Sequence, residues 1–170
     1  MKRTLRFLPT ALVALGLLLH STATARGETD GPWTTDYPAA VARAKAESRP
    51  LFLLFTGSDW CPYCIVLEKE ILGTPEFAHF ARDQLVAVFF DFPRHKRLEA
   101  ALEKQNAAVS NNWDVHAYPT VLIVAPDGRR LGQLGYMEGG PKTFIRAIRQ
   151  LLREGAATPP PSAPTSTPAK

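Results

Sequence analysis

Short, continuous apolar runs alternate with segments of helical periodicity along the middle of the chain. Three of these runs are only five or six residues long and are flanked by turn residues, as strands buried on both faces are. We expect strands at residues 51–55, 85–90 and 121–125. A Pro-Asp-Gly turn at residues 126–128 follows the third run and predicts a hairpin with a partner strand at residues 130–134.

Helical segments are predicted between and after these strands, each marked by an apolar stripe, a capping residue or an early proline. The predicted helices are 38–47, 65–72, 98–106, one that starts at Pro75 with Thr74 as N-cap, and one that starts at Pro141. Strands and helices therefore alternate before a closing hairpin and helix. This order predicts an α/β fold with a central mixed β-sheet flanked by helices on both faces.

The first 25 residues have the pattern of a secretory signal peptide. Three basic residues open this segment, residues 7–19 are mostly apolar, and Ala-Thr-Ala at residues 23–25 fits a cleavage site. The apolar part is shorter than the roughly 20 residues that a membrane span needs, although an uncleaved anchor is an alternative. We therefore expect cleavage of residues 1–25, a periplasmic or secreted protein, and no stable membrane insertion afterwards.

Charge and composition limit the partners and the domain organisation that we expect for the rest of the chain. Removal of residues 1–25 lowers the formal net charge from +4 to +1, because three basic and no acidic residues are lost. The sequence therefore gives no reason to expect nucleic acid as a partner. Residues 155–170 are almost entirely Ala, Thr, Pro and Ser and predict a disordered tail. Residues 30–154 remain for one domain, which we expect to be monomeric.

The only two cysteines, Cys61 and Cys64, lie three positions apart after the first predicted strand and its turn. If a helix begins here, Cys61 lies at its N-terminus, where unpaired N–H groups and the helix dipole stabilise a thiolate. Cys61 is then a candidate nucleophile and Cys64 the thiol that resolves a mixed disulfide. A structural disulfide and half of a zinc site are the alternatives. However, no second cysteine pair exists to complete a zinc site.

The segment around these cysteines resembles the thioredoxin-like superfamily. The resemblance rests on Phe-Thr-Gly-Ser-Asp-Trp-Cys-Pro-Tyr-Cys at residues 55–64, Ala-Tyr-Pro-Thr at residues 117–120, and Gly128 in the hairpin turn. It is similar to secreted bacterial members with a Cys-Pro-Tyr-Cys active site and covers roughly residues 33–152. The resemblance implies a thioredoxin-like fold, no cofactor, and disulfide exchange with protein thiols and disulfides. It also implies a membrane or periplasmic electron donor or acceptor.

The resemblance also implies roles for single residues. Cys61 and Cys64 are expected to form the redox-active disulfide, and a cis Tyr118–Pro119 bond is expected in a loop opposite them. Backbone groups beside Pro119 are expected to bind an extended substrate segment by strand addition. The side chains implied in substrate binding are Trp60, Pro62, Tyr63, Tyr118, Pro119 and Thr120.

One position departs from the pattern of the family. Many thioredoxins carry a buried carboxylate six residues before the first cysteine, where it assists proton transfer at the second cysteine, but this chain has Phe55 there. Asp59, Glu68 and Glu70 are candidate replacements, although each also fits a solvated charge. The proton acceptor for Cys64 is therefore left open by the sequence.

A binding protein with the same fold is the alternative function. Such a protein would hold a client, or would bind copper or another thiophilic metal through Cys61, Cys64 and His116. Copper chaperones of this fold have three residues between the cysteines rather than two, so no metal site is predicted. For an oxidoreductase, the sequence leaves oxidation, isomerisation and reduction of substrates equally open.

Overall fold

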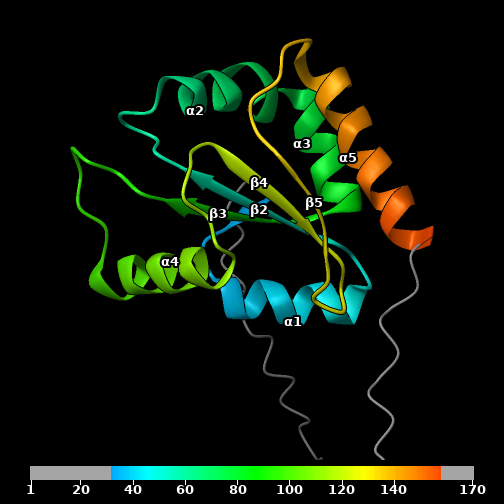
Figure 1. The fold of residues 1–170 in the computed structure, drawn as a ribbon, viewed down its shortest axis with the longest axis horizontal. Coiled ribbons are helices and arrows are strands. Elements are labelled where there is room, and N and C mark those ends of the chain that lie inside the picture. The colour runs from blue at the N-terminus through cyan, green and yellow to red at the C-terminus, as the bar shows by residue number, and fades with distance from the viewer. Residues whose placement is uncertain (1–31, 158–170) are drawn as a thin grey trace, which may run out of the picture.

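Five strands form one mixed sheet within residues 32–157, the part of the chain that the computed structural model describes (Figure 1). The strands are β1 (Trp33–Thr34), β2 (Leu51–Thr56), β3 (Val86–Asp91), β4 (Thr120–Val124) and β5 (Arg130–Leu134). Their order in the sheet is β1-β3-β2-β4-β5. β3 runs parallel to β1 and β2, whereas β4 is antiparallel to β2 and β5. The predicted mixed sheet is confirmed.

Helices cover both faces of this sheet, as predicted (Figure 1). The helical elements are α1 (Tyr37–Glu47), α2 (Pro62–Leu67), a π-helical turn η1 (Glu68–Leu72), α3 (Pro75–Gln84), α4 (Ala100–Asn112) and α5 (Gly140–Ala157). α1 and α4 pack on one face, and α2, η1, α3 and α5 pack on the other. Among residues 32–157, no helix combines the length and apolar character that crossing a bilayer requires.

Strand β2 is buried along its whole length. Its side chains alternate between the two cores: Phe52 and Leu54 face α3 and α5, while Leu53 and Phe55 face α1 and α4. This double coverage explains why its sequence is continuously apolar rather than alternating. The carboxyl end of β2 leads directly into the turn before Cys61, so the central strand fixes the position of the cysteines.

The predicted C-terminal ends of two helices are wrong because packing extends these helices. α4 continues to Asn112 rather than to residue 106, since Val109 is buried and the Asn106 side chain donates a hydrogen bond to the Asp91 carbonyl. α5 continues to Ala157, so Gly155 belongs to the folded domain and not to the predicted tail. The signal peptide and the remaining tail prediction, residues 158–170, lie outside the described residues.

Candidate active site around Cys61 and Cys64

Cys61 and Cys64 form a disulfide at the start of α2, with their Cα atoms 5.2 Å apart. Cys61 is the N-cap of the helix, and its Sγ accepts a hydrogen bond of 3.4 Å from the backbone N–H of Cys64. Pro62 occupies the first turn, where a missing N–H leaves no intrahelical bond unmade. After reduction, the same helix N-terminus would favour a thiolate on Cys61.

The two cysteines differ in exposure. Cys61 retains 5% of its surface, whereas Cys64 retains none. The backbone N–H of Gly57 donates a bond of 3.4 Å to the Cys64 Sγ from the inner side. An external sulfur can therefore approach Cys61 but not Cys64, which is the asymmetry that a nucleophile and a resolving thiol require.

The loop before β4 lies at the same edge of the sheet as the cysteines. Phe55 near the end of β2 pairs with Thr120 at the start of β4, so both connecting segments leave the sheet together. The Tyr118–Pro119 bond is cis, as predicted. The Thr120 hydroxyl donates to the Ala117 carbonyl at 2.8 Å and is buried, so this side chain holds the loop in shape.

Trp60 connects the cysteine turn with this loop. Its indole N–H donates to the Phe92 carbonyl at 2.8 Å, and its ring lies edge-on to Tyr118 at 6.1 Å. Tyr118 in turn stacks on Phe92 at 5.0 Å. Gly57 permits this arrangement, because a Cβ there would lie 2.5 Å from the indole. The structure thus brings Trp60 and Tyr118 together beside Cys61.

Exposed apolar side chains also lie next to the cysteines on α2. Tyr63 is 63% exposed and Ile65 is 45% exposed, and these are the large exposed apolar side chains of the described part. The Tyr63 ring also contacts Tyr136 in the segment after β5, with centroids 5.6 Å apart. Sequence reasoning identified Tyr63 but missed Ile65 and Tyr136. The helical position of Ile65, one residue after Cys64, was the signal that could have indicated it.

Glu68 is a half-buried carboxyl beside Cys64 and not a freely solvated charge. It lies one helical turn after Cys64, and its Oε1 accepts a hydrogen bond of 3.0 Å from the Thr56 hydroxyl. Burial raises the pKa of Glu68, and the charge of Asp91 acts in the same direction, against the hydrogen bond from Thr56. Asp59 and Glu70, the other candidates, lie elsewhere: Asp59 binds backbone N–H groups of residues 94–96, and Glu70 is exposed.

Asp91 is a buried carboxylate that sequence reasoning missed. It ends β3 opposite Thr56 and accepts hydrogen bonds from the Ser58 N–H at 3.0 Å and the Ser58 hydroxyl at 2.7 Å. Lys96 forms an ion pair with it at 2.8 Å. Its place at the carboxyl end of a strand parallel to β2 was the available signal, because such ends meet at one sheet edge. Phe55, by contrast, stacks on Phe90 in the core under α1 and α4.

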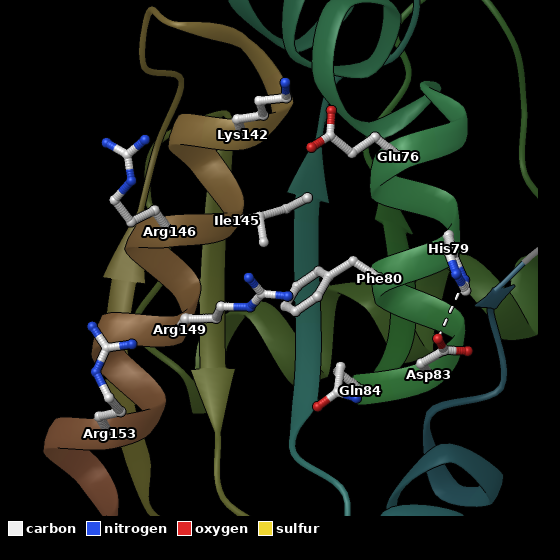
Figure 2. A pocket seen from close by; sticks show the side chains of 10 residues that line it. All are labelled: Glu76, His79, Phe80, Asp83, Gln84, Lys142, Ile145, Arg146, Arg149 and Arg153. Atoms are coloured by element: carbon white, nitrogen blue, oxygen red, sulfur yellow. Dashed lines mark ion pairs between the residues drawn. The ribbon is translucent and has the colours of Figure 1, made fainter.

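No cluster of three His, Cys, Asp or Glu side chains suited to a metal ion occurs among residues 32–157. His116 is exposed, and its Nε2 lies 2.7 Å from the Asp114 carboxylate. A separate cavity of about 570 Å³ lies between α3 and α5. Figure 2 shows the side chains that line it. Its lining includes Phe80, Arg146 and Arg149 but none of the predicted site residues, so the cysteine site does not depend on it.

Comparisons with known proteins agree with this geometry. The disulfide bond reductase DsbH of Chlamydia pneumoniae is 30% identical over 117 residues, which cover 69% of this chain and 70% of that protein. A solved structure of a DsbH oxidoreductase matches with a TM-score of 0.67 at 30% identity, over 69% of this chain and 81% of its own. A thioredoxin from Thermus thermophilus shares the fold, with a TM-score of 0.56 at 22% identity over 74% and 89%.

The family comparison covers most of the described domain. Residues 32–126 match the sequence model of a family described as thioredoxin-like. This segment contains the cysteines, the Pro119 loop and the first four strands. The chain therefore belongs to the thioredoxin-like family.

Proposed function

We propose that the chain is an exported thiol–disulfide oxidoreductase that reduces disulfides in other proteins. The observation that carries this proposal is the Cys61–Cys64 disulfide at the start of α2, in which only Cys61 keeps exposed surface. Family membership supports the chemistry, and the relative named a disulfide bond reductase supports the direction. The pattern of residues 1–25 supports export to the periplasm or beyond.

Reduction of a substrate starts from the dithiol form of the chain. The Cys61 thiolate attacks one sulfur of the substrate disulfide and forms a mixed disulfide, while the other substrate sulfur leaves with the electron pair and takes up a proton. The Cys64 thiolate then attacks the Cys61 Sγ, closes the Cys61–Cys64 disulfide and releases the first substrate sulfur. Two electrons have passed to the substrate, so a membrane or periplasmic dithiol donor must reduce the chain before the next cycle.

The buried Cys64 thiol must lose a proton before it can attack. Glu68 accepts this proton in the proposed scheme, in place of the carboxylate that many thioredoxins have where this chain has Phe55. Its position one turn after Cys64 and its raised pKa support this role, since a base works best when its pKa lies near the working pH. Asp91, held by Ser58 and Lys96, supplies the negative charge that helps to keep this pKa high.

Substrate binding uses the surfaces on both sides of the disulfide. An extended substrate segment pairs with backbone groups beside Pro119, and its side chains contact Trp60, Tyr63 and Tyr118. Thr120 contributes by holding the loop through Ala117 rather than by direct contact. The exposed apolar side chains Tyr63 and Ile65 lie next to the cysteines, which supports a monomer that uses this surface for its substrates.

Trapping of the mixed disulfide tests the proposal. Reduced Cys64→Ser protein is mixed with a disulfide-bonded peptide, and covalent adducts are identified by mass spectrometry. We expect a stable adduct on Cys61, whereas Cys61→Ser, the matched control, should form none because Cys64 is buried. Wild type should reduce the peptide catalytically when a dithiol regenerates it. Failure of wild type to turn over, with stoichiometric copper uptake instead, would favour the binding-protein alternative.

A further inference from the structure

Four consecutive basic residues lie between β3 and α4 and have no part in the proposed chemistry. Arg94, His95, Lys96 and Arg97 are all exposed. We call residues 94–97 the basic loop. A run of like charges on a loop is often only a solvated surface, so its relation to the cysteines decides whether it has a role.

Asp59 fixes the basic loop to the turn that leads into Cys61. Its carboxylate accepts hydrogen bonds from the backbone N–H groups of Arg94 at 2.9 Å, His95 at 2.8 Å and Lys96 at 3.1 Å. Desolvation raises the pKa of Asp59, but these bonds together hold it below its ordinary value. Asp59 is therefore charged at neutral pH and holds the loop two residues before the nucleophile.

Trp60 provides a second attachment for the basic loop. The guanidinium carbon of Arg94 lies 3.6 Å from the centroid of the Trp60 ring, within cation–π range. The same indole donates to the Phe92 carbonyl, just before the loop. Trp60 directly precedes Cys61 and also contacts Tyr118, so Arg94 lies over a residue that a bound substrate would touch. A guanidinium stacked in this way can still offer its N–H edge to a carboxylate.

The cations of the basic loop differ in whether they form ion pairs. Lys96 is paired with Asp91, while Asp59 and Glu99 accept hydrogen bonds from backbone N–H groups. Among residues 32–157, neither Arg94 nor Arg97 takes part in an ion pair. Arg94 and Arg97 are therefore two permanent cations that face solvent, and Arg94 lies against Trp60, the residue before Cys61.

Two glutamates act electrostatically on Tyr136, which contacts Tyr63 of α2. Tyr63 lies between Cys61 and Cys64 in the sequence, and its ring centroid lies 5.6 Å from that of Tyr136. Desolvation and then the charges of Glu70 and Glu138 raise the pKa of Tyr136. Glu70 and Glu138 therefore add negative charge near Tyr136, whereas Arg94 and Arg97 add positive charge in the basic loop, and this difference favours one distribution of substrate charge.

We propose that the basic loop selects client disulfides whose flanking residues are acidic on one side. The inference rests on the proposed reductase function and names the substrate class for that same site. Carboxylates of the client would pair with Arg94 and Arg97 while its disulfide lies over Cys61. Electrostatic attraction of this kind acts mainly on the association rate and weakens with salt.

Three disulfide-bonded peptides of matched sequence test the inference. One carries Asp and Glu on the N-terminal side of the reacting cysteine, one carries them on the C-terminal side, and one has Ser and Gln instead. The reduced full-length chain is mixed with each peptide, and the rate of peptide thiol formation is followed in acid-quenched samples. Each peptide accepts two electrons, while the chain is oxidised to the Cys61–Cys64 disulfide.

At low salt, we expect the ratio of the reaction rate of one acidic peptide to that of the neutral peptide to be about ten. This is the lower end of the rate enhancements that electrostatic steering produces. The ratio should approach one in about 1 M salt, where the Debye length is about 3 Å. Joint replacement Arg94→Gln and Arg97→Gln should lower the ratio roughly fivefold. The matched control is Arg146→Gln, an exposed arginine of α5 that lines the distant cavity (Figure 2) and should leave the ratio unchanged.

The outcomes separate the two proposals. Equal rates for all three peptides, independent of salt, would overturn the acidic-client inference and leave the reductase intact. If no peptide is reduced, both proposals fail. Because the salt series uses wild-type protein, it decides the question even if the double variant does not fold.

Discussion

The hydroxyl of Thr56 donates a hydrogen bond of 3.0 Å to the carboxyl of Glu68. Thr56 directly precedes Gly57, whose N–H donates to the Cys64 Sγ, and Glu68 lies one helical turn after Cys64. Thr56 at the end of β2 and Gly57 after it thus contact one residue of η1 and one residue of α2. This pairing holds a carboxyl beside the buried thiol, although Phe55 provides none from the strand.

Replacement of Glu68 by glutamine should slow the second step of reduction. The amide oxygen of the new side chain can still accept the Thr56 hydrogen bond, but the amide cannot take a proton from Cys64. We expect release of substrate from the Cys61 mixed disulfide to slow by about 10- to 100-fold near neutral pH. This factor lies at or below the rate contribution that a general base usually makes. The defect should shrink towards about pH 8.5, where a free thiol ionises by itself.

Rapid-quench measurement of the mixed-disulfide lifetime checks this prediction. Glu70→Gln is the matched control, because Glu70 lies on the same turn but is exposed. A lifetime that is equally long in both variants, or unchanged in Glu68→Gln, would show that Glu68 is not the proton acceptor.

Glu68 should also make folding stability depend on pH. Burial raises its pKa, so the folded chain keeps a proton on Glu68 at pH values where the unfolded chain has lost it. Its contribution to the free energy of unfolding is complete below the ordinary carboxyl pKa and is lost as pH rises through the raised pKa. Relative to wild type, Glu68→Gln should therefore gain stability as the pH rises above about 4, where an unfolded carboxyl ionises. Urea unfolding of the oxidised proteins over this pH range measures the effect. A difference in the free energy of unfolding between the two proteins that stays constant with pH would contradict this account.

Gly57 should tolerate no larger residue. A Cβ at Gly57 would lie 2.5 Å from the Trp60 indole, which its bond to the Phe92 carbonyl holds in place. We expect Gly57→Ala to lower the free energy of unfolding by about 1–3 kcal/mol. Gly135→Ala serves as the control, since a Cβ there would meet only the Pro119 carbonyl at 3.5 Å and should change stability by less than about 0.5 kcal/mol. Equal effects of the two substitutions would contradict the Trp60 contact.

Asp91 should stabilise the turn before the cysteines. It accepts two hydrogen bonds from Ser58 and pairs with Lys96 while almost fully buried. Asp91→Asn should cost about 1–3 kcal/mol, because an amide replaces one acceptor oxygen and carries no charge. Asp127, an exposed carboxylate that pairs with Arg129, offers a control, and Asp127→Asn should lower stability clearly less than Asp91→Asn. Thermal or urea unfolding of both variants checks the prediction. An equal loss of stability in Asp91→Asn and in the control would refute it.

Local sequence predicted the elements that depend on local chemistry. The continuous apolar run of β2, the Thr74–Pro75 start of α3 and the 126–128 turn each determine structure within a few residues. The position of Cys61 as an N-cap was predictable for the same reason. The cis Tyr118–Pro119 bond was predicted only from the family resemblance, because most Xaa-Pro bonds are trans.

Features that depend on distant contacts were not predictable in this way. Gly155 appeared to belong to a tail, but it is buried where a Cβ would lie 2.5 Å from the Leu131 side chain of β5. Glu68 appeared to be a solvated charge, and its burial depends on Thr56 twelve residues earlier. Such burial arises when elements pack, and a single stretch of sequence carries no direct sign of it.

The reduction potential of the Cys61–Cys64 pair tests the central claim most directly. The oxidised and reduced forms are equilibrated with glutathione buffers of known ratio and quantified after alkylation of free thiols. A protein that reduces other proteins should have a potential near about −270 mV, as thioredoxin has. A potential near about −120 mV would identify an oxidant of proteins and would contradict the proposed function.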